Sequence, residues 1–497
     1  MPRGPTTAGV SEGGSIGRRG FLRVGAGSAI GAAVFVPPIV APRSSRAAVP
    51  TWAKSRASRT PVRNLVFMVS DGMSTGTLTL GDHVRRMEEG RPSSWCSLWE
   101  RPGARRTMQM TSCADALVTD SAAAAAGWGC GFSCNTGVLN ITPDGRQHLP
   151  ILVHAKQNGR ATGVVTTTRV THATPAGFCA NSPHRDLEDD IARQQIERGL
   201  DVIMGGGARH FPDTVLDRRD GHEVVRTADA LFEKVGSPRL IGLFSRDHIP
   251  YVLDRTGDIP SLGEMAIAAI RSLESAPGGF VLQVEGGRVD HAAHDNDAPS
   301  LVREQIEFDR ALGDVLDWMD GRDDTLLVVT TDHGNANPGL TFYGKRGEQG
   351  LRRLLKAERS FEWIFARISQ GRKDGDLSRV AAQAVEAATG VALDQEGLNL
   401  FVASLESRRV MPFRQANTPT SVLGSLLATV YGVAFTSPNH TSDMVELTTL
   451  GPGSERFAPL MRVPEVWTAV TQAMGFAPPQ PLEGMDRVIG LKRIEGD

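Results

Sequence analysis

The sequence predicts an α/β protein built on a mainly parallel central sheet sandwiched between helices. Five short runs are apolar and rich in β-branched residues, at 64–70, 163–168, 201–204, 280–284 and 325–331. Uninterrupted apolar runs of this length are typical of parallel strands that are buried on both faces. Residues 187–199 and 299–319 have the spacing of amphipathic helices and are expected to form crossovers between strands.

The stretch from 341 to 430 has a different pattern. It is rich in Arg, Lys, Ala and Leu at helical spacing, and we expect no further strand until residues 421–435. We therefore predict a mostly helical insertion, or cap, at about 341–430 over the edge of the sheet.

Composition excludes several classes of protein. The 497 residues include 54 Lys+Arg and 56 Asp+Glu, for a formal charge of -2, and 40% of them are hydrophobic. This balance is typical of a globular protein and lacks the strongly basic character of a nucleic-acid-binding protein. The body of the chain has no run of about 20 apolar residues, which argues against a multi-span membrane protein and against stable membrane insertion.

Residues 1–47 are predicted to be an export signal. Arg18 and Arg19 precede a mildly apolar stretch at 24–41, a pattern that resembles twin-arginine signals. Small residues at Ser45 and Ala47 favour cleavage after Ala47, whereas the glycines and prolines of the stretch disfavour the alternative of a retained anchor. The segment carries six arginines and one acid, so its removal changes the formal charge from -2 to -7. We expect a periplasmic or secreted protein.

The chain contains five cysteines: Cys96, Cys113, Cys130, Cys134 and Cys179. In an oxidising compartment they could form two disulfides and leave one thiol, with a connectivity that the sequence leaves open. Cys130 and Cys134 lie four residues apart, but without a second such pair a zinc site there is not favoured. We interpret all five as structural residues.

Acidic residues follow three of the predicted strands, namely Asp71, Glu285 and Asp332. One acid at a strand end is usually a helix cap or part of a turn. In parallel sheets, however, ligands bind at the carboxyl ends of the strands, so three such acids are expected to share one site.

Potential metal ligands accompany these acids. Asp290 and His294 lie at i and i+4, on one face of a helix, where they can share a metal ion. His333 follows Asp332 directly, and His440 follows the strand expected at 421–435. Asp, Glu and His together favour zinc and magnesium over metals that prefer thiolates.

Ser121 is the candidate nucleophile. It precedes five consecutive alanines, the strongest helix-forming run in the chain, so it is expected at a helix N-terminus, where free N–H groups favour anions. The alternative is a serine that only caps the helix. Because no catalytic-triad or elbow motif surrounds Ser121, we expect a metal ion to activate its hydroxyl.

Six motifs together resemble those of the alkaline phosphatases. They are VSDGMS at 69–74, TDSAAAA at 119–125, THATPAGF at 171–178, VEGGRVDHAAHDND at 284–297, TTDHG at 330–334 and SPNHTSD at 437–443. They are long, they occur in the family's order, and they cover most of the mature chain. The resemblance implies that residues 48–497 are one alkaline phosphatase-like catalytic domain with a cap.

The resemblance also implies a role for each site residue. One zinc ion would be held by Asp290, His294 and His440, and a second by Asp71, Asp332 and His333. A magnesium ion would be held by Asp71, Thr174 and Glu285, with His172 and His291 beside it, where they would tune this third metal. Ser121 would form a phosphoserine, and Arg185 would bind two phosphate oxygens, although Arg169 lies close to it in the sequence. The substrates would be small phosphate monoesters, and a homodimer is compatible with the resemblance.

Three other functions are alternatives to phosphomonoester hydrolysis. A phosphodiesterase or nucleotide pyrophosphatase of the same superfamily would share the two zinc sites, but it would not need Arg185 and a third metal, both suited to a dianionic monoester. A sulfatase is disfavoured because the Cys or Ser motif of a formylglycine precursor is missing from the sequence. A non-catalytic exported phosphate- or metal-binding protein would have no need of Ser121 at a helix start.

Overall fold

The computed structural model describes residues 62–218, 221–371 and 375–491. The predicted export signal at 1–47 and its cleavage site lie outside the described residues. None of the helices in the described part of the chain combines the length and the apolar character needed to cross a membrane.

The described residues contain a ten-stranded sheet in the order β14-β2-β13-β8-β1-β7-β3-β4-β6-β5. Its strands are β1 Asn64–Ser70, β2 Arg105–Met110, β3 Ala161–Arg169, β4 Val202–Gly206, β5 Glu223–Val225, β6 Leu240–Leu243, β7 Phe280–Gly286, β8 Thr325–Thr330, β13 Val445–Leu450 and β14 Leu460–Arg462. Only β13 runs antiparallel to its neighbours, β2 and β8, within the described sheet. The mainly parallel sheet predicted from the sequence is therefore confirmed.

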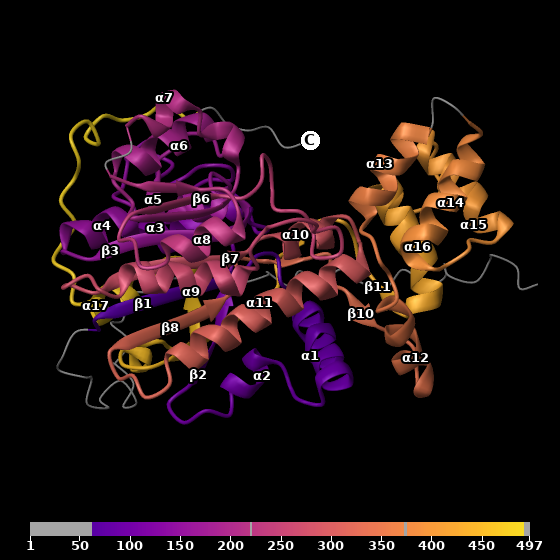
Figure 1. Ribbon diagram of the computed structural model, residues 1–497, viewed down its shortest axis with the longest axis horizontal. Coiled ribbons are helices and arrows are strands. Elements are labelled where there is room, and N and C mark those ends of the chain that lie inside the picture. Colours follow the sequence, from indigo (N-terminus) through magenta and orange to yellow (C-terminus); the bar gives the residue numbers. More distant parts are fainter. Residues whose placement is uncertain (1–61, 219–220, 372–374, 492–497) are drawn as a thin grey trace, which may run out of the picture. The chain divides into compact units, whose positions relative to one another are not determined.

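Helices cover both faces of this sheet (Figure 1). They are α1 Thr75–Glu89, α2 Ser94–Leu98, α3 Ser121–Cys130, α4 Ile151–Gln157, α5 Ala173–Cys179, α6 Glu188–Glu197, α7 Asp213–Leu216, α8 Ala228–Lys234, α9 Leu262–Leu273, α10 Arg288–His294, α11 Ala298–Trp318 and α17 Val463–Met474. The central strand β1 shows how the two cores arise. Phe67 packs with Trp128 and Phe178 on the face covered by α3 and α5, whereas its neighbours Val66 and Met68 belong to the opposite core. This alternation follows from the two-residue period of a strand.

The described residues between 345 and 431 form a short 3-10 helix, Arg414–Asn417, and five α-helices: α12 Lys345–Leu354, α13 Phe361–Gly371, α14 Leu377–Thr389, α15 Gln395–Leu405 and α16 Pro419–Tyr431. They share a third apolar core with α1 and α11, to which Ile364, Phe401, Leu427 and Val302 contribute. The cap is thus packed through its own core onto two helices of the sheet domain.

The prediction of a strand at 421–435 is wrong. Most of that segment is helix α16, and only the two-residue strand β11, Val433–Ala434, follows it. Thr418 caps the helix by accepting a hydrogen bond from the Ser421 N–H, and Gly432 ends it in a left-handed conformation. A short apolar run does not by itself distinguish a helix from a strand. Here the two caps favour a helix of 13 residues.

Candidate active site

Three neighbouring strands bring the predicted acids together. β1 lies between β7 and β8, and Val69 is in register with Glu285 on one side and with Thr330 on the other. Asp71 directly follows the carboxyl end of β1, and Asp332 lies two residues beyond the carboxyl end of β8. All three carboxylates are completely buried.

A first group of ligand atoms comes from Asp290, His294 and His440, which lie within 4.8 Å of one another. The Nε2 atoms of the two histidines are 2.9 Å apart. Their Nδ1 atoms are bound to backbone carbonyls, that of His294 to Pro438 at 2.6 Å and that of His440 to Thr119 at 2.9 Å. Because Nδ1 donates to a carbonyl in each case, the Nε2 lone pairs are left facing a shared point, as metal ligation requires.

His440 reaches this group through a short antiparallel ladder. Strand β12, His440–Thr441, pairs with β9, Gly334–Asn335, so that Thr441 lies opposite Gly334. The ladder places the His440 ring 3.6 Å from that of His333, measured between centroids. His440 therefore does not follow a long strand at 421–435, as the sequence suggested, but belongs to a two-residue strand.

A second group consists of Asp71, Asp290 and His333. Asp332 lies beside it, with Oδ2 2.9 Å from His333 Nε2 and with Oδ1 accepting a hydrogen bond from the Gly72 N–H at 3.0 Å. Asp290 thus contributes to two groups of ligand atoms.

A third group consists of Asp71, His172 and Glu285. Thr174 donates from its hydroxyl to Asp71 Oδ2 at 3.0 Å, and Thr166 donates to Glu285 Oε2. A ring nitrogen of His172 lies close enough to the two carboxylates to share a metal ion with them. The resemblance implies only that His172 lies beside the metal ligands.

His291 lies in a cluster of three histidine rings with His172 and His248. The ring centroids are separated by 5.4 Å for His172 and His291 and by 4.5 Å for His248 and His291. His291 Nδ1 accepts from Arg288 at 2.7 Å. Burial lowers the pKa of His248 to about 3, so this ring is neutral at neutral pH. His248 did not emerge from the sequence because no motif surrounds it.

Ser121 is the first residue of α3, and Asp120 is its cap. Asp120 Oδ1 accepts a hydrogen bond from the Ala123 N–H at 3.0 Å. The Ser121 hydroxyl is therefore not needed as the cap, contrary to the alternative that it serves only in that role. Instead, Oγ lies 3.2 Å from His333 Nε2, beside the metal-ligand groups.

Arg185 reaches the same place from the chain before α6. Its Nη1 donates to Asp120 Oδ2 at 3.0 Å, and its Nη2 lies 3.2 Å from His172 Nε2. Burial would raise the pKa of Asp120, but Arg185 and backbone N–H donors lower it, so the pair is ionic. Arg169 is instead held by Glu188, at 2.7 Å, and by Asp247, at 2.9 Å.

The electrostatics of the site favour bound cations. Burial, followed by the charges of Asp332, Asp290 and Glu285, raises the pKa of Asp71 well above its usual value. Asp71 Oδ1 and Glu285 Oε1 have no hydrogen-bond partner among the described residues. Buried carboxylates are normally paired or bound to metal, so this set of ligands suits divalent cations.

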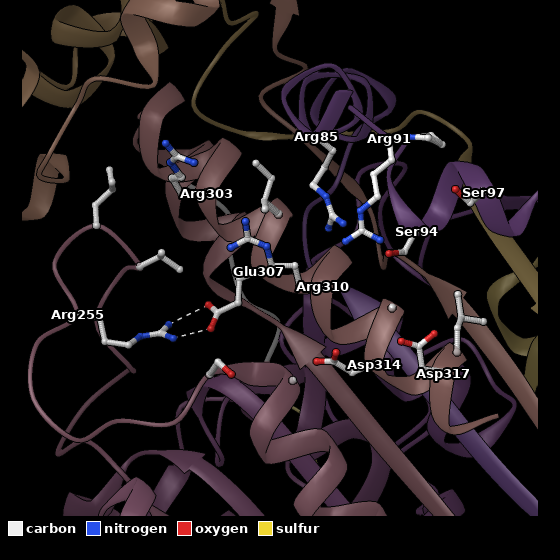
Figure 2. A pocket seen from close by; sticks show the side chains of 18 of the residues that line it. Arg85, Arg91, Ser94, Ser97, Arg255, Arg303, Glu307, Arg310, Asp314 and Asp317 are labelled. Atoms are coloured by element: carbon white, nitrogen blue, oxygen red, sulfur yellow. Dashed lines mark hydrogen bonds and ion pairs between the residues drawn. The ribbon is translucent and has the colours of Figure 1, made fainter. Parts of the chain in front are cut away.

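A cavity of about 870 Å³ lies elsewhere (Figure 2). It is lined by residues of α1, α2, α9 and α11 and of nearby loops, among them the loop at 252–255, and none of these residues belongs to the candidate active site. Its arginines are largely engaged: Glu89 alone binds Arg85 at 2.8 Å, Arg91 at 3.0 Å and Arg310 at 3.1 Å. The convergent groups of metal-binding side chains, and not this cavity, mark the candidate active site.

Comparison with known proteins agrees with this geometry. A profile of the family described as Alkaline phosphatase matches residues 62–466. The chain belongs to the alkaline phosphatase family. Alkaline phosphatase 4 of Bacillus subtilis is 28% identical over 423 residues, which cover 82% of this chain and 87% of that protein. Alkaline phosphatase of Gadus morhua is 33% identical over 335 residues, or 56% of this chain and 70% of that protein.

Solved alkaline phosphatases share the fold. The crystal structure of the Thermus thermophilus alkaline phosphatase has a TM-score of 0.77 and 30% identity, covering 88% of this chain and 98% of that chain. The cold-active alkaline phosphatase of Shewanella sp., at 24% identity and a TM-score of 0.71, supports the fold alone. Together with the family match, these similarities identify the protein as a phosphomonoesterase of a metal-dependent family, in agreement with the resemblance seen in the sequence. These similarities argue against the alternative of a non-catalytic binding protein.

Proposed function

We propose that this alkaline phosphatase acts through a phosphoserine formed on Ser121 and releases inorganic phosphate. The observation that carries the proposal is the position of the Ser121 hydroxyl. Asp120 caps α3, so Oγ is free to face the metal-ligand groups, 3.2 Å from His333 Nε2. A serine retained only to start the helix would have its oxygen on the backbone N–H groups.

We further propose that the enzyme holds two zinc ions and one magnesium ion. Asp290, His294 and His440 would hold one zinc, Asp71, Asp332 and His333 the other, and Asp71, Thr174 and Glu285 the magnesium, with His172 and His291 beside it. When bound, these cations supply the positive charge that lowers the pKa of the Ser121 hydroxyl and stabilises the departing oxygen.

The protein's own groups position the reaction. Arg185 would donate its guanidinium N–H groups to two oxygens of the phosphoryl group, and the N-terminus of α3 would add backbone N–H donors. Ser121 Oγ then attacks phosphorus while the bond to the alcohol oxygen breaks, and the alcohol departs. Water next attacks the phosphoserine, which returns the serine hydroxyl and releases phosphate.

The Ser121→Ala variant tests the phosphoserine. We expect aryl phosphate hydrolysis to fall by at least about a thousandfold at unchanged metal content, because the nucleophile is lost. Ser133→Ala, an exposed serine just beyond the other end of α3, is the matched control. Wild-type activity in metal-loaded Ser121→Ala would overturn the mechanism.

A phosphodiesterase of the same superfamily is the alternative. The position of Arg185 beside the third group, 3.2 Å from His172, favours a dianionic monoester. Rates on an aryl phosphate monoester and on the matching diester, measured with chelator and after separate addition of zinc and magnesium, discriminate the two. A large preference for the diester would refute the monoesterase assignment.

We also propose export by the twin-arginine segment to the periplasm or the medium, and assembly as a homodimer. Arg18→Lys combined with Arg19→Lys should leave activity inside the cell, whereas the wild type is found outside the cytoplasm. Light scattering on the purified mature chain gives its oligomeric state, and a monomer mass would refute the dimer.

A further inference from the structure

Two buried cysteines lie together at the end of the helix that carries Ser121. Cys130 is the last residue of α3, and Cys134 follows four residues later. Both are buried, with exposed fractions of 2% and 0%, and with Ala126 they form a small apolar cluster of their own among the described residues. Their Sγ atoms lie at the same distance, 3.9 Å, from one acceptor, the carbonyl oxygen of Phe132.

A tight turn brings the two side chains together. Gly131 ends α3 with a φ of 79°, and its N–H donates to the Gly127 carbonyl at 3.1 Å. This left-handed conformation reverses the chain, so that Cys134 comes back against the last turn of the helix. After burial, the neighbouring Cys134 thiol is the next cause that raises the pKa of Cys130.

We propose that Cys130 and Cys134 form an intramolecular disulfide in the mature enzyme. Formation of the S–S bond removes two protons and two electrons from the thiols, and the electrons reduce the disulfide of an oxidant, small molecule or protein, to two thiols. Because both sulfurs are buried, the exchange takes place before the turn closes over them. The inference rests on the proposed export only in that an oxidising compartment supplies such an oxidant.

The other three cysteines have different partners. Cys113 Sγ lies 3.6 Å from Thr136 Oγ1, and Cys179 donates to the Pro175 carbonyl at 3.3 Å. Cys96 lies on α2, where its N–H binds Ser93. The pairing of Cys130 with Cys134 is therefore the one that the packing favours.

The cross-link would restrain a loop that supports both sides of the active site. The Cys134 carbonyl accepts from the Ala114 N–H at 3.0 Å, in the segment that leads to Ser121. Three residues further on, the Gly137 carbonyl accepts from the Arg185 N–H at 2.8 Å. A disulfide at the base of this loop would hold the backbone of Arg185 in its phosphate-binding position.

Peptide mapping tests the bond itself. The purified enzyme is unfolded and reduced, and is then refolded with zinc and magnesium in oxidised and reduced glutathione at the ratio of an oxidising compartment, until the pattern no longer changes. It is then unfolded in iodoacetamide and digested. Trypsin leaves Cys113, Cys130 and Cys134 in one peptide, 107–146, but chymotrypsin can cleave after Leu117 and Phe132 and so separate all three.

We expect peptides carrying Cys130 and Cys134 to remain joined until they are reduced, with Cys113 alkylated. Alkylation of both Cys130 and Cys134, or a link from either to Cys113, would overturn the proposal. Mapping uses neither activity nor cell fractionation, so its outcome is independent of the proposed mechanism and of export.

A second measurement tests the restraint on Arg185. The double variant Cys130→Ala/Cys134→Ala keeps the apolar cluster but cannot form the bond, and Cys96→Ala is the matched control. We expect inhibition by inorganic phosphate to weaken by about threefold or more in the double variant, with kcat changed less, because Arg185 is held less firmly. The same phosphate inhibition constant in the double variant and the wild type would overturn the restraining role.

Discussion

Asp120 connects the helix that carries Ser121 to the arginine that faces it. One carboxylate oxygen caps α3 through the Ala123 N–H, and the other accepts from Arg185, each at 3.0 Å. A displacement of α3 would therefore also displace Arg185. Ser121 and Arg185 are positioned as a unit because a single planar group holds both.

Arg185→Ala should lower kcat/KM for an aryl phosphate by roughly 10- to 100-fold, since two charge-assisted hydrogen bonds to the phosphoryl group are lost. Arg185→Lys should recover only part of the loss, because an ammonium group cannot bind two oxygens in a fork. Arg193→Ala, which removes a surface arginine paired with Asp190 and Glu197 on α6, is the control. Equal kinetics for Arg185→Ala and the control would contradict the assignment.

At the scale of elements, α3 and α5 pack closely through glycines. A Cβ on Gly129 would lie 2.0 Å from the Gly177 carbonyl oxygen, and a Cβ on Gly177 would lie 2.5 Å from the Ala125 side chain. The helix with Ser121 thus lies directly against the helix with Thr174. Small residues allow this approach, and larger ones would push the two helices apart.

Gly129→Ala is expected to lower the free energy of unfolding by about 1–3 kcal/mol, through the overpacking that a methyl group causes there. Urea denaturation of the metal-loaded enzyme measures it. Gly339→Ala is the control, because a methyl group at that position meets no described atom within 4 Å. Similar unfolding midpoints for the two variants would show that the α3–α5 contact is looser than described.

Asp297 joins the sheet domain to the cap. It is the N-cap of α11, where it accepts from the Ser300 N–H at 3.1 Å, and it also accepts from the Phe361 N–H of α13 at 2.7 Å. Burial is the main cause that raises its pKa from 3.8 to about 7. Over the pH range between these two values, Asp297 therefore keeps its proton in the folded protein but has lost it in the unfolded chain.

This raised pKa predicts a pH dependence. The stabilisation that protonated Asp297 gives the folded protein is fully present below the pKa of Asp297 in the unfolded chain. It is lost as pH rises through about 7. Between about pH 5.5 and 8.5, the wild type should lose roughly 1–2 kcal/mol relative to Asp297→Asn, which cannot ionise. Urea unfolding of both proteins across this range measures the difference. A constant difference would mean that Asp297 does not titrate there.

At the scale of the whole molecule, four buried carboxylates, Asp71, Glu285, Asp290 and Asp332, lie together at the carboxyl ends of the central strands, Asp290 on α10. Their mutual repulsion opposes folding unless cations are bound. Metal binding is therefore expected to stabilise the whole domain and not only to permit catalysis.

Removal of metal should lower the thermal midpoint by roughly 5 °C or more and abolish hydrolysis, because ligands that bind only the folded state contribute several kcal/mol. Calorimetry before and after chelation, with metal content measured, gives the shift. Chelator saturated beforehand with zinc is the control. An unchanged midpoint in metal-free protein would contradict a stabilising role of the metals.

Several features of the fold and site were predictable because their signals are local. Apolar runs located β1, β3, β4, β7 and β8, and the i,i+4 spacing of Asp290 and His294 indicated a shared face. The short strands β5, β6 and β14, and the partly exposed β2, have weak patterns and were not predicted. At 421–435 the apolar run predicts a strand, but capping residues make most of it helix α16.

The sequence by itself determined the family and which side chains we propose as metal ligands, since each proposed ligand lies in a motif of a few residues. Only the tertiary structure decided which groups meet. The order of β8, β1 and β7 brings Asp332, Asp71 and Glu285 together, and the β9–β12 ladder adds His440. Asp120 as the cap of α3, His248 beside His291, and the Cys130–Cys134 pair depend in the same way on packing. The physical reason is that a motif specifies what a side chain can bind, whereas its neighbours across the sheet are set by strand pairing and core burial over the whole chain.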